Sequence, residues 1–166
     1  MSIERISTGR SARVLLPDTN VLLLLFVGLW DRSRIPKFKN TKIFTEDDFD
    51  LLMEILDGFG NVVTTTHILA EISNLSGQHG DPERSDLFRK LVSLIPLLPE
   101  YHLGADIAVV DPVFVRLGLT DAAIAAIASD RGLHVLTTDF DLWAHLQKIG
   151  VASYNFNHIR QAGLLP

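Results

Sequence analysis

The sequence predicts an α/β fold, a three-layer sandwich in which helices cover both faces of a central, mainly parallel sheet. Short apolar runs alternate along the chain with segments of helical periodicity, and strands separated by helices usually pair in parallel. The 166 residues are 47% hydrophobic, which is enough to bury a core and argues against disorder. We therefore expect a single domain over residues 1–166, with its core at about 14–157.

The first half of the chain opens with an apolar stretch that a polar triplet interrupts. The run 14–16 is typical of a buried strand that ends at Pro17, and Asp18 or Asn20 can cap the helix that follows. Thr45, followed by three acidic residues, predicts the start of another helix. The expected elements are a strand at 14–16, a helix to about residue 30, a polar loop at 31–44 and a helix from 45 to Gly58.

In the second half, Pro and Gly mark the expected boundaries. Pro82 and Pro112 can start helices, and Gly118 can end one. The segment 120–131 is rich in Ala and Ile on all sides, which indicates a deeply packed helix. The expected elements are strands at 61–65, 133–138 and 151–156, helices at 66–75, 82–94, 120–131 and 140–148, and a short helical piece at 111–118.

The composition excludes several classes of protein. The chain has no cysteine, so disulfides, thiolate metal sites and cysteine nucleophiles are ruled out. The apolar stretch near the N-terminus could be mistaken for a signal peptide, but the segment 17–20 splits it. The longest apolar piece, 21–30, is ten residues long, which is too short to span a membrane. We expect a soluble, cytoplasmic protein with no membrane partner.

Four acidic residues occupy positions at which this fold class places ligands. Asp18 and Asp139 follow expected strands, at the end of a parallel sheet where ligands bind, although each can also be a helix cap. Glu71 lies on the apolar side of its expected helix, where it can belong to a site or pair with a buried arginine. Asp121 lies in the first turn of an apolar helix, where capping is the other interpretation.

Taken together, these acids predict a metal site. Carboxylates that share a crevice of low dielectric cannot all ionise without a compensating cation. Ligands that offer only oxygen select hard ions such as Mg²⁺ or Mn²⁺. The six histidines are scattered, with no HExxH spacing, so zinc is not expected.

At these residues the chain resembles the PIN-domain ribonucleases, through four motifs that occur in order from Val14 to about Phe156. The motifs are VLLPDTNVLLLL at 14–25, TTTHILAEISNL at 64–75, LTDAAIAAIA at 119–128 and VLTTDFDL at 135–142. The resemblance implies that Asp18, Glu71, Asp121 and Asp139 form one metal site. It also implies supporting roles for Asn20 and for the hydroxyl of Thr137 or Thr138, whereas Asp141 is either an auxiliary acid or a helix-start residue.

The resemblance further implies a PIN-like fold and an endoribonuclease that hydrolyses RNA phosphodiester bonds with Mg²⁺ or Mn²⁺. Many bacterial proteins of this type are toxins bound by an antitoxin, often as homodimers, and others process RNA. The sequence does not separate these roles, and DNA stays open as a substrate. The alternative is a catalytically silent PIN-like module that binds RNA or a protein.

Charge is distributed unevenly along the chain. Residues 1–42 carry eight Lys or Arg and three Asp or Glu, whereas the rest carries seven and seventeen, so a basic N-terminal quarter precedes an acidic body. Within the expected loop at 31–44, residues 31–42 hold five of these cations with Phe38 among them. This mixture suits single-stranded RNA, and an ordinary solvated loop is the other interpretation. The candidate RNA contacts are Arg32, Arg34, Lys37, Phe38, Lys39 and Lys42.

Overall fold

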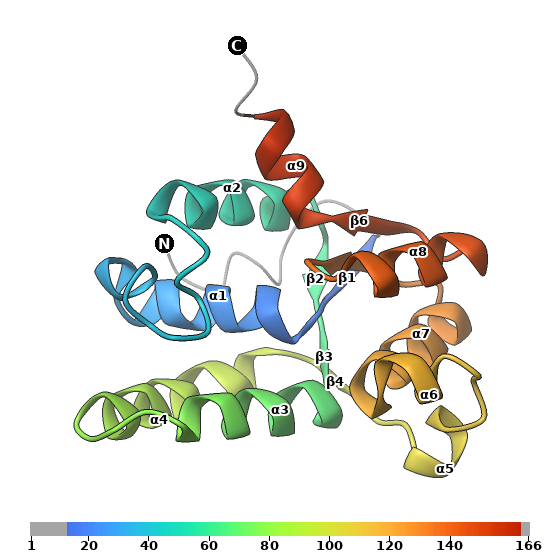
Figure 1. The fold of residues 1–166 in the computed structure, drawn as a ribbon, viewed down its shortest axis with the longest axis horizontal. Coiled ribbons are helices and arrows are strands. Elements are labelled where there is room, and N and C mark those ends of the chain that lie inside the picture. The colour runs from blue at the N-terminus through green and yellow to red at the C-terminus, as the bar shows by residue number, and fades with distance from the viewer. Residues whose placement is uncertain (1–12, 164–166) are drawn as a thin grey trace.

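The computed structural model describes residues 13–163 and has helices on both faces of a four-stranded sheet (Figure 1). The strands lie in the order β2-β1-β5-β6, and all three pairings between them are parallel. This arrangement confirms the predicted α/β sandwich with a mainly parallel central sheet. The strands of this sheet are β1 (Val14–Pro17), β2 (Asn61–Val62), β5 (His134–Thr137) and β6 (Ser153–Asn155).

The helices account for most of the chain and cover the sheet. In Figure 1, α2 and α9 lie above α1, α3 and α4 lie below it, and α5 to α8 gather on the right. The α-helices are α1 (Thr19–Trp30), α2 (Glu46–Asp57), α3 (Thr66–Gly77), α4 (Glu83–Leu94), α5 (Ala105–Ala108), α6 (Phe114–Leu117), α7 (Leu119–Arg131), α8 (Phe140–Lys148) and α9 (Phe156–Ala162). The 3₁₀ helices of residues 13–163 are η2 (Arg32–Arg34) and η3 (Ile95–Leu97).

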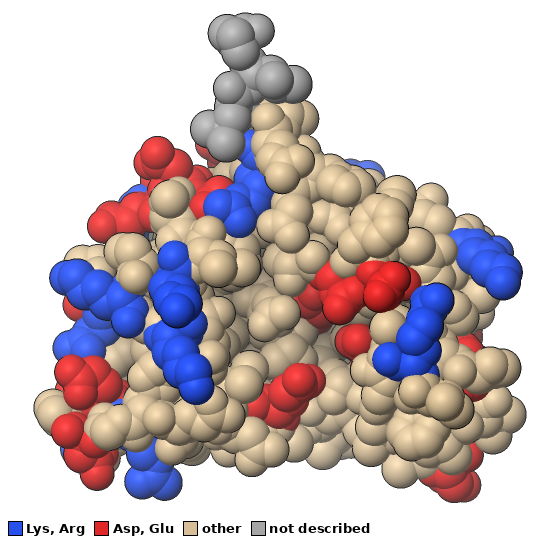
Figure 2. Space-filling view, viewed as in Figure 1, with Lys and Arg blue, Asp and Glu red and all other residues tan. Residues whose placement is uncertain are grey.

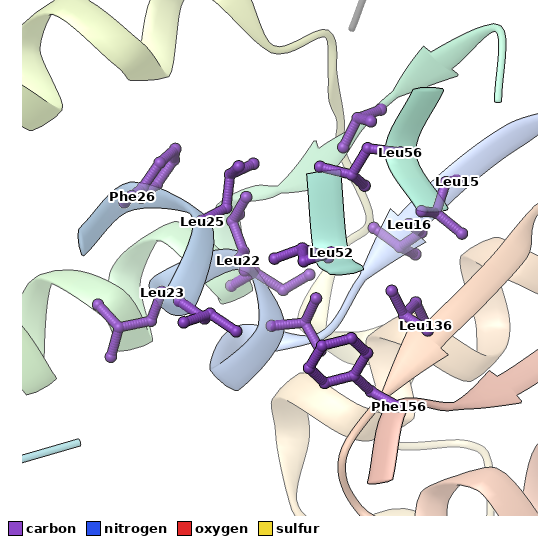
Figure 3. Close-up of a cluster of buried hydrophobic side chains, with 14 of the residues drawn as sticks. Leu15, Leu16, Leu22, Leu23, Leu25, Phe26, Leu52, Leu56, Leu136 and Phe156 are labelled. Atoms are coloured by element: carbon purple, nitrogen blue, oxygen red, sulfur yellow. The ribbon is translucent and has the colours of Figure 1, made fainter. Parts of the chain in front are cut away.

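Helix α1 forms the centre of the hydrophobic core. Nine of its residues are buried, and it packs against α2, α3 and α4. Figure 3 shows its side chains Leu22 and Leu25 among Leu52 of α2, Leu136 of β5 and Phe156 of α9. A helix that is apolar all round has to be covered on all sides, and these neighbours provide that cover.

The register of β1 and β5 positions the functional residues. Pro17 lies opposite Leu136, and the main-chain N–H of Asp18 donates to the carbonyl of Leu136 at 2.9 Å. Both strands therefore end at the same level. Asp18, directly after β1, therefore lies beside Thr137 at the end of β5 and beside residues 138–139 that follow it, at the carboxyl edge of the sheet.

The structure differs from the predicted elements in several places, and the sequence analysis predicted neither β4 (Glu100–Tyr101) nor α5 nor α9. The expected strand at 61–65 divides at Val63, because β2 pairs with β1 while β3 (Thr64–Thr65) pairs with β4 (Glu100–Tyr101) in a separate two-stranded sheet. The last strand is shorter than expected, since Phe156 begins α9. The polar loop at 31–44 contains the buried side chains Ile35, Phe38, Thr41 and Phe44, so it is a packed part of the domain.

Among the helices of residues 13–163, none combines the length and the hydropathy that crossing a membrane requires.

Candidate functional site

Asp18 directly follows β1; the residue is 4% exposed, and its carboxylate accepts three hydrogen bonds. Its Oδ1 accepts from the main-chain N–H of Val21 at 2.8 Å, which caps α1. Its Oδ2 accepts from the hydroxyl of Thr137 at 2.5 Å and from the N–H of Thr138 at 2.8 Å. Burial raises the pKa of Asp18 above its ordinary value, although these three hydrogen bonds oppose the rise.

Thr137 joins two of the four acids. It is fully buried, its hydroxyl donates to Asp18, and the same oxygen accepts from the N–H of Asp139 at 2.9 Å. The sequence left open which threonine faces the site, and the side chain that does so is Thr137. Thr138 contributes its main-chain N–H instead, and its hydroxyl accepts from Nδ2 of Asn20 at 3.4 Å.

Glu71 approaches the site from α3. The hydroxyl of Thr19 donates to Oε2 of Glu71 at 2.8 Å, so α3 is connected to the residue directly after Asp18. Thr19 is itself buried. The sequence analysis did not assign it a role, although its place inside the DTN triplet was the available signal.

Asp139 is both a site residue and a helix cap. Its Oδ1 accepts from the N–H groups of Asp141 and Leu142, at 2.7 and 3.0 Å, and thereby starts α8. The capping interpretation is thus confirmed for Asp139, and its second oxygen is not engaged in that cap. Asp141 is exposed in the first turn of α8.

Asp121 shows that the four acids share one environment. It lies in the first turn of α7, and its pKa is raised to about 7, first by burial and then by the charges of Asp18, Asp139 and Glu71. A carboxylate feels such repulsion only when the other carboxylates are near it. Figure 2 shows acidic side chains gathered around a hollow at the centre of this face.

The cluster formed by these four acids, which we call the carboxylate cluster, has no compensating cation among the described residues. Within residues 13–163, no Lys, Arg or His forms an ion pair with Asp18, Glu71, Asp121 or Asp139. The donors that the cluster offers are all oxygen, which is the chemistry that Mg²⁺ and Mn²⁺ prefer. In the described part of the chain, no three His, Asp or Glu side chains lie close enough together to hold a metal ion directly.

The segment 31–44 presents fewer free cations than its sequence indicates. Arg32 forms an ion pair with Asp50 at 2.6 Å, and Arg34 lies near Glu83 at 3.7 Å. Lys39 donates to the side chain of Gln78 at 3.3 Å. Lys37 and Lys42 are exposed. Figure 2 shows basic side chains over this segment on the left of the hollow and others over α6 and α8 on its right.

The prediction that Phe38 stacks on an RNA base is wrong. Its side chain is 4% exposed, and its ring is stacked on the imidazole of His79 with 3.6 Å between the ring centroids. The ring therefore has no face left for a base. Local composition suggested an exposed aromatic, whereas the contact that buries it comes from a residue 41 positions further along the chain.

Asn157 is a supporting residue that the sequence analysis missed. Its Nδ2 donates to the main-chain carbonyl of Thr138 at 3.0 Å, and its Oδ1 accepts from Arg160 at 3.4 Å. Arg160 in turn forms an ion pair with the nearly buried Asp48 at 2.9 Å. The turn between β5 and α8 is thus fixed from α9. The sequence feature that could have indicated a role for Asn157 is the NFN segment at 155–157, at the end of the last expected strand.

No protein-family model matches the chain, and no curated protein sequence matches it. Among solved structures, the chain is similar to the crystal structure of PAE2754 from Pyrobaculum aerophilum, with a TM-score of 0.54 and 20% sequence identity over 92% of this chain and 91% of that chain. At this identity the likeness concerns the fold alone. It supports the α/β sandwich described above over nearly the whole length of both chains.

Proposed function

We propose that this protein is a metal-dependent ribonuclease of the PIN-domain type, which hydrolyses RNA phosphodiester bonds at the carboxylate cluster. The observation that carries the proposal is that Asp18, Glu71, Asp121 and Asp139 lie near one another and that, among residues 13–163, no Lys, Arg or His forms an ion pair with them. Such a cluster costs stability, because like charges in a partly buried site repel. A function that requires a divalent cation explains why the chain retains it.

The chain's own residues would prepare this site for Mg²⁺ or Mn²⁺. Asp18, Glu71, Asp121 and Asp139 would hold the ion, and rotation of the half-buried and exposed side chains would bring their oxygens to it. A bound divalent ion supplies a nucleophilic water and stabilises the charge that develops on the phosphate. Thr137 and the N–H of Thr138 orient the carboxylate of Asp18, as the partners of metal ligands generally do.

The polyanionic substrate also needs cations that contact its phosphates. Lys37, Lys39 and Lys42 are the exposed lysines of the 31–44 segment. We assign phosphate contacts to these three lysines. Phe38 is not an RNA contact, because its ring is buried against His79. Arg32 and Arg34 are held by acidic neighbours, so their part in RNA binding is the smaller one.

Two biological roles fit this chemistry. One is a cytoplasmic toxin that an antitoxin inhibits, acting as a homodimer, and the other is an RNA-processing enzyme. Both require the same cleavage reaction, so cleavage is the property to test first.

The test is cleavage of total cellular RNA by the purified full chain in Mg²⁺, in Mn²⁺ and in EDTA. Asp121→Asn removes one acid of the cluster while its side chain keeps nearly the same shape. Asp130→Asn is the matched control, because Asp130 lies on the same helix and is exposed beside Arg131. We expect metal-dependent fragments from the native chain and from Asp130→Asn, and none from Asp121→Asn.

The catalytically silent module is distinguished by metal binding. Calorimetric titration of the native chain with Mn²⁺ should give a binding isotherm that Asp121→Asn weakens or abolishes. A native chain that neither binds Mn²⁺ nor cleaves RNA would reject the nuclease and leave the silent binding module. Equal cleavage by the native chain and Asp121→Asn would reject the assignment of the metal site.

A further inference from the structure

Three aromatic side chains gather next to Asp139, one of the acids of the carboxylate cluster. Phe140 begins α8 directly after Asp139, Trp143 lies one turn further on, and His158 comes from α9. The ring centroids of Phe140 and Trp143 are 5.5 Å apart, those of Trp143 and His158 5.1 Å, and those of Phe140 and His158 6.3 Å. We call this group the aromatic shelf.

The exposure of Phe140 is the feature that calls for a function. Its side chain is 59% exposed although it belongs to one of the most apolar residue types. A single exposed apolar residue is normal on a protein surface. Phe140, however, is held in place by two further rings from two different helices, so its position is fixed while one side of the ring stays open to solvent.

The shelf and the carboxylate cluster are fixed relative to each other. Phe140 is covalently bonded to Asp139, whose carboxylate caps the same helix. His158 follows Asn157, and Asn157 donates to the carbonyl of Thr138 in the turn that supports Asp18. Whatever lies on the shelf is therefore held beside the cluster at a defined position.

We propose that Phe140, supported by Trp143 and His158, stacks on one unpaired base of a single-stranded RNA whose neighbouring phosphate lies at the carboxylate cluster. An exposed, rigid aromatic ring next to a site that receives phosphate is the arrangement with which proteins bind single strands, because every base offers a flat face. In a duplex both faces of each internal base are already stacked, so the shelf selects unpaired strands. This inference rests on the proposed function for the identity of the cluster's substrate.

The test measures binding separately from cleavage. A single-stranded RNA oligonucleotide with a fluorescent label is titrated with the full chain, and anisotropy is recorded in EDTA and again in Mg²⁺. The variants are Phe140→Ala, which removes the ring, and Phe140→Trp, which restores one. Phe88→Ala is the control, because Phe88 is a half-buried aromatic on α4, where Arg84 lies over its ring.

We expect Phe140→Ala to weaken single-strand binding by about 5- to 150-fold, the effect of losing one stacked base. Phe140→Trp and Phe88→Ala should bind like the native chain, and a fully paired duplex should bind equally to native chain and Phe140→Ala. Unchanged single-strand affinity in Phe140→Ala, or no single-strand binding by the native chain in either buffer, would overturn the proposal. Loss of self-association in Phe140→Ala, with strand affinity unchanged, would overturn it in favour of a protein contact.

The two proposals fail in different ways. If the native chain binds single strands through Phe140 but never cleaves them, the proposed role of the aromatic shelf is supported and the proposed nuclease activity is rejected. If the native chain and Phe140→Ala cleave RNA equally well and bind RNA equally well, the nuclease activity is supported and the proposed role of the aromatic shelf is rejected.

Discussion

Replacing Asp121 by Asn should make the folded protein more stable at neutral pH in the absence of metal. The pKa of Asp121 is raised from 3.8 to about 7 by burial and by Asp18, Asp139 and Glu71. The folded protein therefore binds a proton at this carboxyl more readily than the unfolded chain does. By linkage, stability from this group is fully present below about pH 4 and is lost as the pH rises through about 7. Asparagine carries no charge at any of these pH values, so the variant does not lose this stability as the pH rises.

The size of the effect follows from the same rise in pKa. A shift from 3.8 to about 7 corresponds to roughly 4 kcal/mol of unfolding free energy for full ionisation. Asp121 is only half-buried, so water screens part of this interaction and we expect about 2 kcal/mol. In a domain of this size, 2 kcal/mol raises the melting temperature by about 4 to 8 °C.

The assay is urea unfolding of the full chain in EDTA at about pH 5 and about pH 8, read by circular dichroism. The native chain should lose stability between the two values, and Asp121→Asn should lose clearly less. Asp130→Asn, the exposed acid on the same helix, should behave like the native chain, because an exposed ion pair contributes little. Addition of Mg²⁺ should stabilise the native chain more than Asp121→Asn.

One result would refute the reasoning directly. If Asp121→Asn were no more stable than the native chain at about pH 8 in EDTA, the four carboxylates would not be repelling one another. The carboxylate cluster would then have no electrostatic cost for a cation to relieve.

Three further predictions follow from other contacts. Thr137→Val should lower the free energy of unfolding by about 2 kcal/mol, because the carboxylate at the end of β1 loses a buried hydrogen bond. Thr137→Ser keeps a hydroxyl and should retain most of the native stability. Equal stability of the native chain and the valine variant in urea would contradict the role of the hydroxyl. Gly28→Ala should cost about 1 to 3 kcal/mol, since the added Cβ collides with an aromatic ring of α2; a thermal melt unchanged from the native one would show that this helix contact can adjust. Reversing the charge of Lys37, Lys39 and Lys42 together should weaken RNA binding and reduce the slope of log K against log salt by about 2; an unchanged slope would make the segment an ordinary solvated surface.

The sequence predicted the elements whose signals are local. Thr45 and Asp48 form a reciprocal cap at the start of α2, with hydrogen bonds of 3.1 and 2.8 Å, and the acidic run after Thr45 had indicated this start. The long helices were found because periodicity and caps agree within each segment. The order of helices and strands then sufficed for the fold class.

Features that depend on distant partners were not predictable. The segment 61–65 divides because β1 and β4 each pair with only part of it, and nothing within those five residues marks Val63. Phe38 is buried by a ring from another part of the chain. The register between β1 and β5 decides whether Thr137 or Thr138 directs its side chain toward Asp18. The sequence alone is compatible with either register, so it could not select one of the two threonines.

The long separation between the two halves of the site has a consequence for synthesis of the protein. Two of the three hydrogen bonds that Asp18 accepts come from residues 119 and 120 positions further along the chain. At about 5 to 20 residues per second, a ribosome needs roughly 6 to 24 s to add that length. Throughout this interval the leucine-rich α1 exists without β5, so the apolar surface that the folded domain buries is still incompletely covered. The hydrogen bonds that orient Asp18 from β5 can therefore form only after almost the whole domain has been synthesised.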